Sequence, residues 1–99
     1  MPRKMTDRKT LKDLEGWTQT PISTPSVLRP ESAGYTVFMS PDEKRVAQVE
    51  MTTEAVSIIF NRETRRIEYI HPITTVGMER MGVTREMMER MLGRGYDSV

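Results

Sequence analysis

The feature that most constrains this chain is a stretch near its C-terminus, residues 78–92, in which one glycine, Gly82, separates two helix-forming segments. Thr84 is a favourable N-cap for the second segment, because its hydroxyl can accept a hydrogen bond from a free N–H of the first helical turn. Gly93 and Gly95 are stop signals, since either residue can adopt the left-handed conformation that ends helices. These signals predict a helix that begins after Thr84 and ends near Gly93, preceded by a short helix over residues 73–81.

The last predicted helix is amphipathic. Its apolar side chains follow one another at spacings of one, three and four residues, which places them in a single stripe; they are Met87, Met88, Met91 and Leu92. The other face carries Arg85, Glu86, Glu89 and Arg90, and Glu86 can pair with Arg90 one turn later. We expect the stripe to be buried, together with Met78 and Met81, against one face of a sheet.

Four segments upstream have the pattern of β-strands: residues 35–39, 45–51, 55–60 and 66–70. Apolar and polar residues alternate over 45–51, as in a half-buried strand. The run 55–60 is almost continuously apolar, which is typical of a strand at the centre of a sheet. Short polar turns separate the segments, so neighbouring strands should pair antiparallel. The predicted fold class is α+β: a four-stranded antiparallel meander followed by two short C-terminal helices, with an extended N-terminal arm.

The first part of the chain, residues 1–34, is predicted to be a flexible arm. A short helix can begin at Thr6 or Asp7 and end at Gly16, with Trp17 as the side chain that docks it. Three prolines follow among Thr and Ser, which disfavours both a helix and a strand ladder. The predicted organisation is therefore an arm over 1–34, a small domain over 35–95 and a tail over 96–99.

The composition limits the size of the hydrophobic core and the kind of protein this can be. A chain of 99 residues with an apolar fraction of 36% provides one small core. A domain of roughly 60 residues buries only about 60% of its unfolded surface, so we expect the arm or a second subunit to contribute. The absence of cysteine excludes disulfides and cysteine-ligated zinc. No apolar run approaches the roughly 20 residues of a membrane span, and a cytoplasmic, soluble protein is expected.

Charge is spread along the chain. Residues 1–34 hold six basic and four acidic residues (+2), residues 35–71 hold five and six (−1), and residues 72–99 hold four of each (0). Nucleic-acid binders usually concentrate Lys and Arg on one face, because contacts with phosphates supply most of their affinity. The distribution favours another kind of partner.

The turn at Gly82 nevertheless resembles the helix-turn-helix of bacterial and phage repressors, in which a glycine and an aliphatic residue form the turn. Gly82, Val83, Met88 and Met91 fit this pattern, whereas the first helix departs from it, with Gly77 where an aliphatic residue is usual. The resemblance implies DNA contact through Thr84, Arg85, Glu86, Glu89 and Arg90. The same stretch also resembles the first half of a ubiquitin-associated domain, so the pattern specifies a helix–turn–helix bend rather than one family.

The sequence offers little for catalysis. His71 is the only histidine, and a nucleophilic site or a metal site would need further ligands or partners. Gly93 and Gly95 follow a helix rather than precede one, so they do not form a phosphate-binding loop. We therefore predict no catalytic, cofactor-binding or metal-binding residues, and no cofactor.

The favoured function is that of a small accessory or regulatory protein, of the kind found in bacteria or phages, that binds another protein and self-associates. Methionine adapts to irregular surfaces and is frequent where one helix must fit varied partners. The predicted partner-binding residues are Trp17, Met87, Met88, Met91 and Leu92, together with whichever sheet edge is left open. The alternative is a DNA-binding regulator that uses the helix-turn-helix-like segment.

Overall fold

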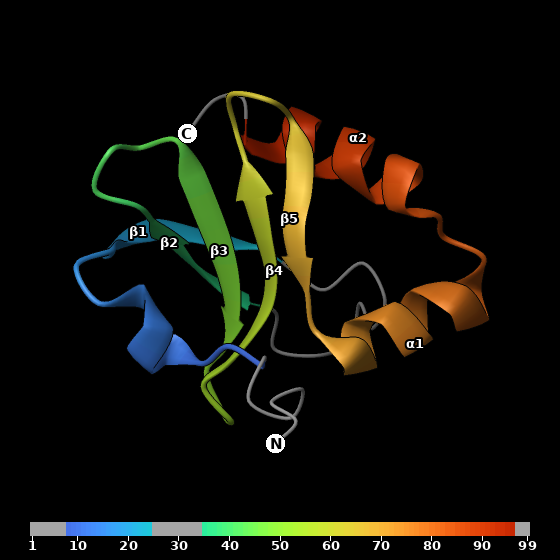
Figure 1. Cartoon of the computed structure of the whole chain (residues 1–99), viewed down its shortest axis with the longest axis horizontal. Helices are drawn as coiled ribbons and strands as arrows, with labels where there is room; N and C mark the ends of the chain where they lie inside the picture. The colour runs from blue at the N-terminus through green and yellow to red at the C-terminus, as the bar shows by residue number, and fades with distance from the viewer. Residues whose placement is uncertain (1–7, 25–34, 97–99) are drawn as a thin grey trace, which may run out of the picture.

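The computed structural model of this protein describes residues 8–24 and 35–96, with side chains for 8–20 and 35–96. Within these residues the chain forms one antiparallel sheet and two α-helices (Figure 1). The elements are a 3₁₀ turn η2 (Leu11–Leu14), the strands β1 (Thr18–Thr24), β2 (Tyr35–Met39), β3 (Arg45–Glu50), β4 (Ala55–Asn61) and β5 (Arg66–Ile70), and the helices α1 (Pro72–Met81) and α2 (Arg85–Tyr96). The strands lie in the sheet in chain order, so each pairs with its neighbour in sequence. The predicted α+β meander with two C-terminal helices is confirmed.

The sheet has one strand more than the sequence predicted. Residues 18–24, which we assigned to the extended arm, pair antiparallel with β2 from Thr18 opposite Met39 to Thr24 opposite Tyr35. This edge strand tolerates Pro21, because proline has no backbone N–H to donate and the pairing with β2 is irregular between Gln19 and Ser23. The rest of the predicted arm (1–7 and 25–34), including the proposed helix start at Thr6 or Asp7, and the tail residues 97–99 lie outside the described residues.

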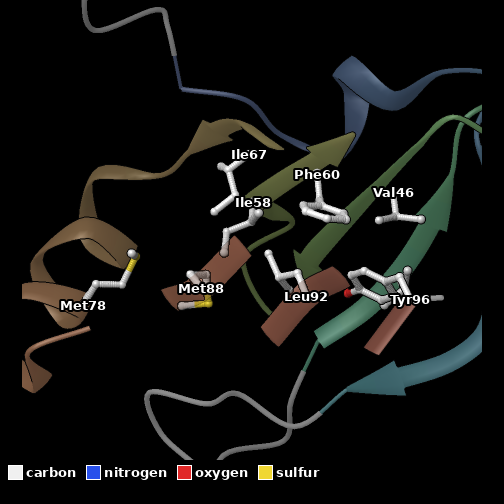
Figure 2. Packing of buried hydrophobic residues seen from close by; sticks show 9 residues of the cluster. Val46, Ile58, Phe60, Ile67, Met78, Met88, Leu92 and Tyr96 are labelled. Atoms are coloured by element: carbon white, nitrogen blue, oxygen red, sulfur yellow. The ribbon is translucent and has the colours of Figure 1, made fainter. Parts of the chain in front are cut away.

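The two faces of the sheet carry separate hydrophobic clusters. On one face, side chains of β2 to β5 pack beneath α1 and α2 (Figure 2); the buried members are Val37, Val46, Ile58, Phe60, Ile67, Met78, Met88, Leu92 and Tyr96. On the other face, Leu14 of η2 covers Phe38, Ala47, Val49, Val56 and Ile59, with Leu11, Trp17 and Tyr69 packed against them. Because alternate residues of a strand point to opposite faces, this arrangement explains why β4 is buried along nearly its whole length.

The segment before β1 is held against the sheet by backbone hydrogen bonds. The Leu11 N–H donates to the Glu54 carbonyl (2.9 Å), and the Val56 N–H donates to the Lys9 carbonyl (3.0 Å). The predicted helix ending at Gly16 is reduced to the single turn η2, which Thr10 and Asp13 cap reciprocally. The expected docking of Trp17 is observed, and the sheet is thereby covered on its second face as well.

Helix α1 has a histidine as its N-cap. His71 Nδ1 accepts a hydrogen bond from the Ile73 N–H (3.1 Å), Pro72 occupies the first helical position, and Gly82 closes the helix with φ of 70°. Burial, followed by the charge of Arg8, lowers the pKa of His71. Only neutral imidazole has a free nitrogen lone pair to accept this bond, so the cap exists only in the uncharged state.

Stability should therefore depend on the protonation of His71. The pKa of His71 is lower in the folded chain than in the unfolded chain, so the unfolded chain binds more protons as the pH falls. The cap contributes its full stability above about pH 6.5. This contribution is lost as the pH falls from there through the pKa of the folded state. We expect urea midpoints to fall between about pH 7.5 and pH 5 in the wild type. The variant His71→Asp, which caps without titrating in this range, should show a flatter profile. His71 is the only histidine, so parallel profiles for the two proteins would contradict this role.

Helix α2 begins where the sequence predicted but continues past the predicted stop. The Thr84 hydroxyl accepts from the Met87 N–H (3.1 Å), as an N-cap should. The expected end at Gly93 or Gly95 is wrong, because the helix extends to Tyr96, whose side chain is 2% exposed. Gly93 instead permits a close approach: a Cβ there would lie 2.8 Å from Nη2 of Arg65. Burial of Tyr96 thus outweighs the low helix propensity of the glycines.

Candidate functional site

The buried face of α2 differs from the predicted methionine stripe. Met88, Leu92 and Tyr96, one turn apart, face the sheet, and Met91 is half-buried beside them. Met87 is 40% exposed, and Met81 at the end of α1 is 51% exposed. The prediction that these two methionines are buried is wrong. Met87 is exposed because the buried face of α2 is centred between residues 88 and 89 rather than between 87 and 88. Met81 is the last residue of α1, whose buried residues are Thr74 and Met78.

Glu89 is the clearest departure from the predicted pattern. We placed it on the outer face, but it is 8% exposed and its carboxylate accepts from the Ile67 N–H (2.8 Å) and from Arg66 Nε (3.3 Å). Arg85, one turn earlier, donates from Nη2 to the Ile67 carbonyl (2.6 Å) and lies 3.8 Å from the Glu89 carboxylate. Two side chains of α2 therefore bond the N–H and C=O of one β5 residue, as the backbone of a neighbouring strand would.

A groove lies next to this contact, along the outer side of β5. Its volume is about 710 Å³. The lining residues come from β5, from α1 and from the turn that leads into α2; they are Glu68, Tyr69, Ile70, Thr75, Met78, Glu79, Gly82, Val83, Thr84 and Arg85. β5 is the outermost strand on this side of the described sheet. The groove thus combines the edge of β5 with α1 and with the turn that joins α1 to α2. Figure 1 shows these three parts of the chain on one side of the sheet.

The groove has an apolar part and an acidic part. Ile70, Met78 and Val83 belong to the helix-side cluster or pack against it, and they provide the apolar part. The carboxylate of Glu68 accepts hydrogen bonds from Arg45 Nε (2.6 Å) and Asn61 Nδ2 (2.9 Å), which lower its pKa. The charge of Arg45 therefore balances the charge of Glu68. Glu79 is an exposed carboxylate on α1. The surface is suited to a ligand with apolar groups and a positive charge.

The predicted partner-binding residues are not gathered in one exposed surface. Trp17, Met88 and Leu92 pack within the two hydrophobic clusters, and Met91 is partly covered, so Met87 is the most accessible of the five. Exposed apolar side chains lie instead on α1, where Ile73 is 71% and Val76 is 48% exposed. The spacing of three residues between Ile73 and Val76 was the available sequence signal for this surface.

The residues predicted to contact DNA are also divided. Thr84 caps α2, and Arg85 and Glu89 bond the backbone of Ile67. Glu86 and Arg90 are exposed on the far side of the helix. The five residues therefore do not form one outward face.

No protein-family model, curated protein or solved structure matches the chain. Over residues 8–24 and 35–96, no helix has the length and apolar character needed to cross a membrane. The same residues contain no group of three or more His, Asp or Glu side chains arranged to hold a metal ion.

Proposed function

We propose that this protein is a non-enzymatic accessory or regulatory protein that binds an extended segment of a different protein along β5. The observation that carries this proposal is that the groove of about 710 Å³ runs beside the outermost strand of the sheet. An extended peptide can add to such an edge through main-chain hydrogen bonds, and its alternate side chains then enter neighbouring pockets. The groove volume lies within the roughly 300–1,000 Å³ range of ligand sites.

The contacts at Ile67 limit where the incoming segment can pair. Arg85 and Glu89 already bond the carbonyl and the N–H of Ile67. The segment therefore pairs beyond this residue, alongside Glu68 to Ile70, where the groove lies. Its apolar side chains would contact Ile70, Met78 and Val83.

The charges of the groove favour a basic partner. Glu79 is exposed at the groove, and a Lys or Arg of the bound segment would lie near it. A second copy of this chain fits less well at β5: antiparallel pairing of two β5 strands about their centre would set Glu68 opposite Glu68, and each Glu68 is already paired with Arg45, so the pairing adds no opposite charge. The exposed Ile73 and Val76 of α1 are the better surface for self-association.

The DNA-binding alternative has weaker support. It requires residues 84–90 to read the major groove, whereas Arg85 and Glu89 are engaged with Ile67. Freeing them would leave the β5 edge uncapped.

The proposal can be tested with a displayed library of random linear peptides selected on the purified protein. We expect selected peptides to combine alternating apolar residues with Lys or Arg. Glu79→Lys should weaken their binding by about threefold to tenfold, as expected for reversal of an exposed charge at a binding site. Glu86→Lys, an equal change of charge on an exposed residue outside the groove, is the matched control and should leave affinity near that of the wild type.

Backbone pairing provides a second criterion. N-methylation of alternate peptide amides should abolish binding in one register and spare it in the other, because only every second amide faces β5. Selected peptides that tolerate methylation in both registers, or that lose equal affinity to both charge variants, would refute binding along β5. Light scattering of the wild type and of Ile73→Asp would report self-association separately.

A further inference from the structure

The start of α2 contains an unusual reciprocal cap. The Met87 N–H donates to the Thr84 hydroxyl oxygen (3.1 Å), and the Thr84 N–H donates to the Met87 thioether sulfur (3.5 Å). This is the geometry of a capping box, in which the residue at the third helical position reaches back to the N-cap N–H. That position usually holds Glu or Gln, whose oxygen is a good acceptor, whereas a thioether is a weak one.

We propose that Met87 is an oxidation site at which conversion to the sulfoxide strengthens the cap of α2. In the reaction, the sulfur lone pair attacks one oxygen of a peroxide, an S–O bond forms as the O–O bond breaks, and the displaced oxygen leaves as water or alcohol after taking up a proton. Sulfur is oxidised by two electrons and the peroxide is reduced by two. The new oxygen is a strong hydrogen-bond acceptor, and the Thr84 N–H, which already donates to the sulfur, can donate to it.

Accessibility makes this reaction selective. Met87 is 40% exposed, whereas Met88, the next residue, is 2% exposed and Met78 is 5% exposed. Oxidation follows exposure, and a sulfoxide in the core would bury a polar group without a partner. Met51 and Met81 are also exposed, at 43% and 51%, but no residue of the described chain donates a hydrogen bond to either sulfur. Met87 is therefore accessible to the oxidant and lies beside an N–H donor that can stabilise the sulfoxide.

The effect on the helix should be stabilising. Oxidation of methionine ordinarily disrupts packing, because it makes an apolar side chain polar. At Met87 the added oxygen lies at the positive end of the helix dipole, where partial negative charge is favoured. The sulfoxide thus replaces a weak sulfur acceptor with an oxygen, as Gln would. This inference does not depend on peptide binding at β5.

The test uses the full chain with the substitutions Met51→Leu and Met81→Leu. Among the residues that the structure describes, Met87 is then the remaining exposed methionine. After limited treatment with hydrogen peroxide and peptide mapping, amide hydrogen exchange is measured by NMR. Exchange at the Thr84 amide should slow by about threefold to tenfold, the range expected for one improved hydrogen bond. The Gly82 amide, which donates to the Glu79 carbonyl, is the internal reference and should not change.

Two further variants and a reversal complete the experiment. Met87→Gln should slow Thr84 exchange without oxidant, because it forms an ordinary capping box, and Met87→Leu should abolish the response to peroxide. Methionine sulfoxide reductases should restore the original exchange rate. The proposal is overturned if peroxide modifies Met87 no faster than Met88, or if the Thr84 amide of the oxidised protein exchanges at an unchanged or higher rate.

Discussion

Tyr96→Ala is expected to lower the free energy of unfolding by about 4 kcal/mol, because it removes a large buried ring and leaves a buried amide unpaired. The Tyr96 ring lies 6.2 Å from that of Phe60, and its hydroxyl accepts from Nε2 of Gln48 at 2.7 Å. Both Tyr96 and Gln48 are buried, at 2% and 8% exposure. Domains of this size have total stabilities of about 5–15 kcal/mol. Urea unfolding should therefore show a protein near the limit of folding.

Two controls separate the ring from the hydroxyl. Tyr96→Phe keeps the packing against Phe60 but leaves Gln48 without its partner, at an expected cost of about 1–3 kcal/mol. Combining it with Gln48→Leu removes both polar groups and should recover part of that loss. A Tyr96→Ala protein with a near-wild-type urea midpoint would show that the last turn of α2 contributes little to the core.

Elements defined by local patterns could be predicted from the sequence. Alternation identified β3, the apolar run identified β4, and the cap at Thr84 located the start of α2. In each case the deciding interactions join residues close in sequence, or depend on which residues must face a core.

Elements decided by distant contacts could not be predicted in the same way. β1 contains Pro21, and only its edge position beside β2 makes it a strand. The local glycine signals at the end of α2 are overridden by the burial of Tyr96 against β3 and β4. The polar character of Glu89 suggested a solvent-facing side chain, because its partner, the Ile67 N–H, lies on another element.

The candidate site illustrates the same division. An open sheet edge was predicted as a contact surface, since any open sheet has two edges. The groove beside β5 is assembled from Glu68–Ile70, from one face of α1 and from the turn at Gly82. Its position depends on the angle at which the two helices leave the sheet, and no local sequence signal reports that angle.

Replacing Glu89 with leucine tests whether α2 protects the β5 edge. The substitution removes the acceptor of the Ile67 N–H and the partner of Arg85 and Arg66. Loss of a buried hydrogen bond to a charged group costs about 1.5–3 kcal/mol. The two arginines are half or more exposed and can turn to water, so we expect about 2–3 kcal/mol rather than the larger cost of stranding a fully buried charge. Urea unfolding gives this value, and Glu89→Gln, which keeps an oxygen acceptor, should lose less.

The same substitution should change how the protein associates. With Glu89 gone and Arg85 released, the N–H and C=O of Ile67 join the open edge, and an apolar residue takes the place of a charge that discouraged pairing. Light scattering should therefore detect concentration-dependent association of Glu89→Leu at concentrations where the wild type does not change. Glu86→Leu adds the same apolar side chain to an exposed position of the same helix, so equal association of both variants would attribute the effect to surface hydrophobicity. Association of Glu89→Leu alone would mean that two side chains of α2 occupy the position at which another strand would otherwise bind.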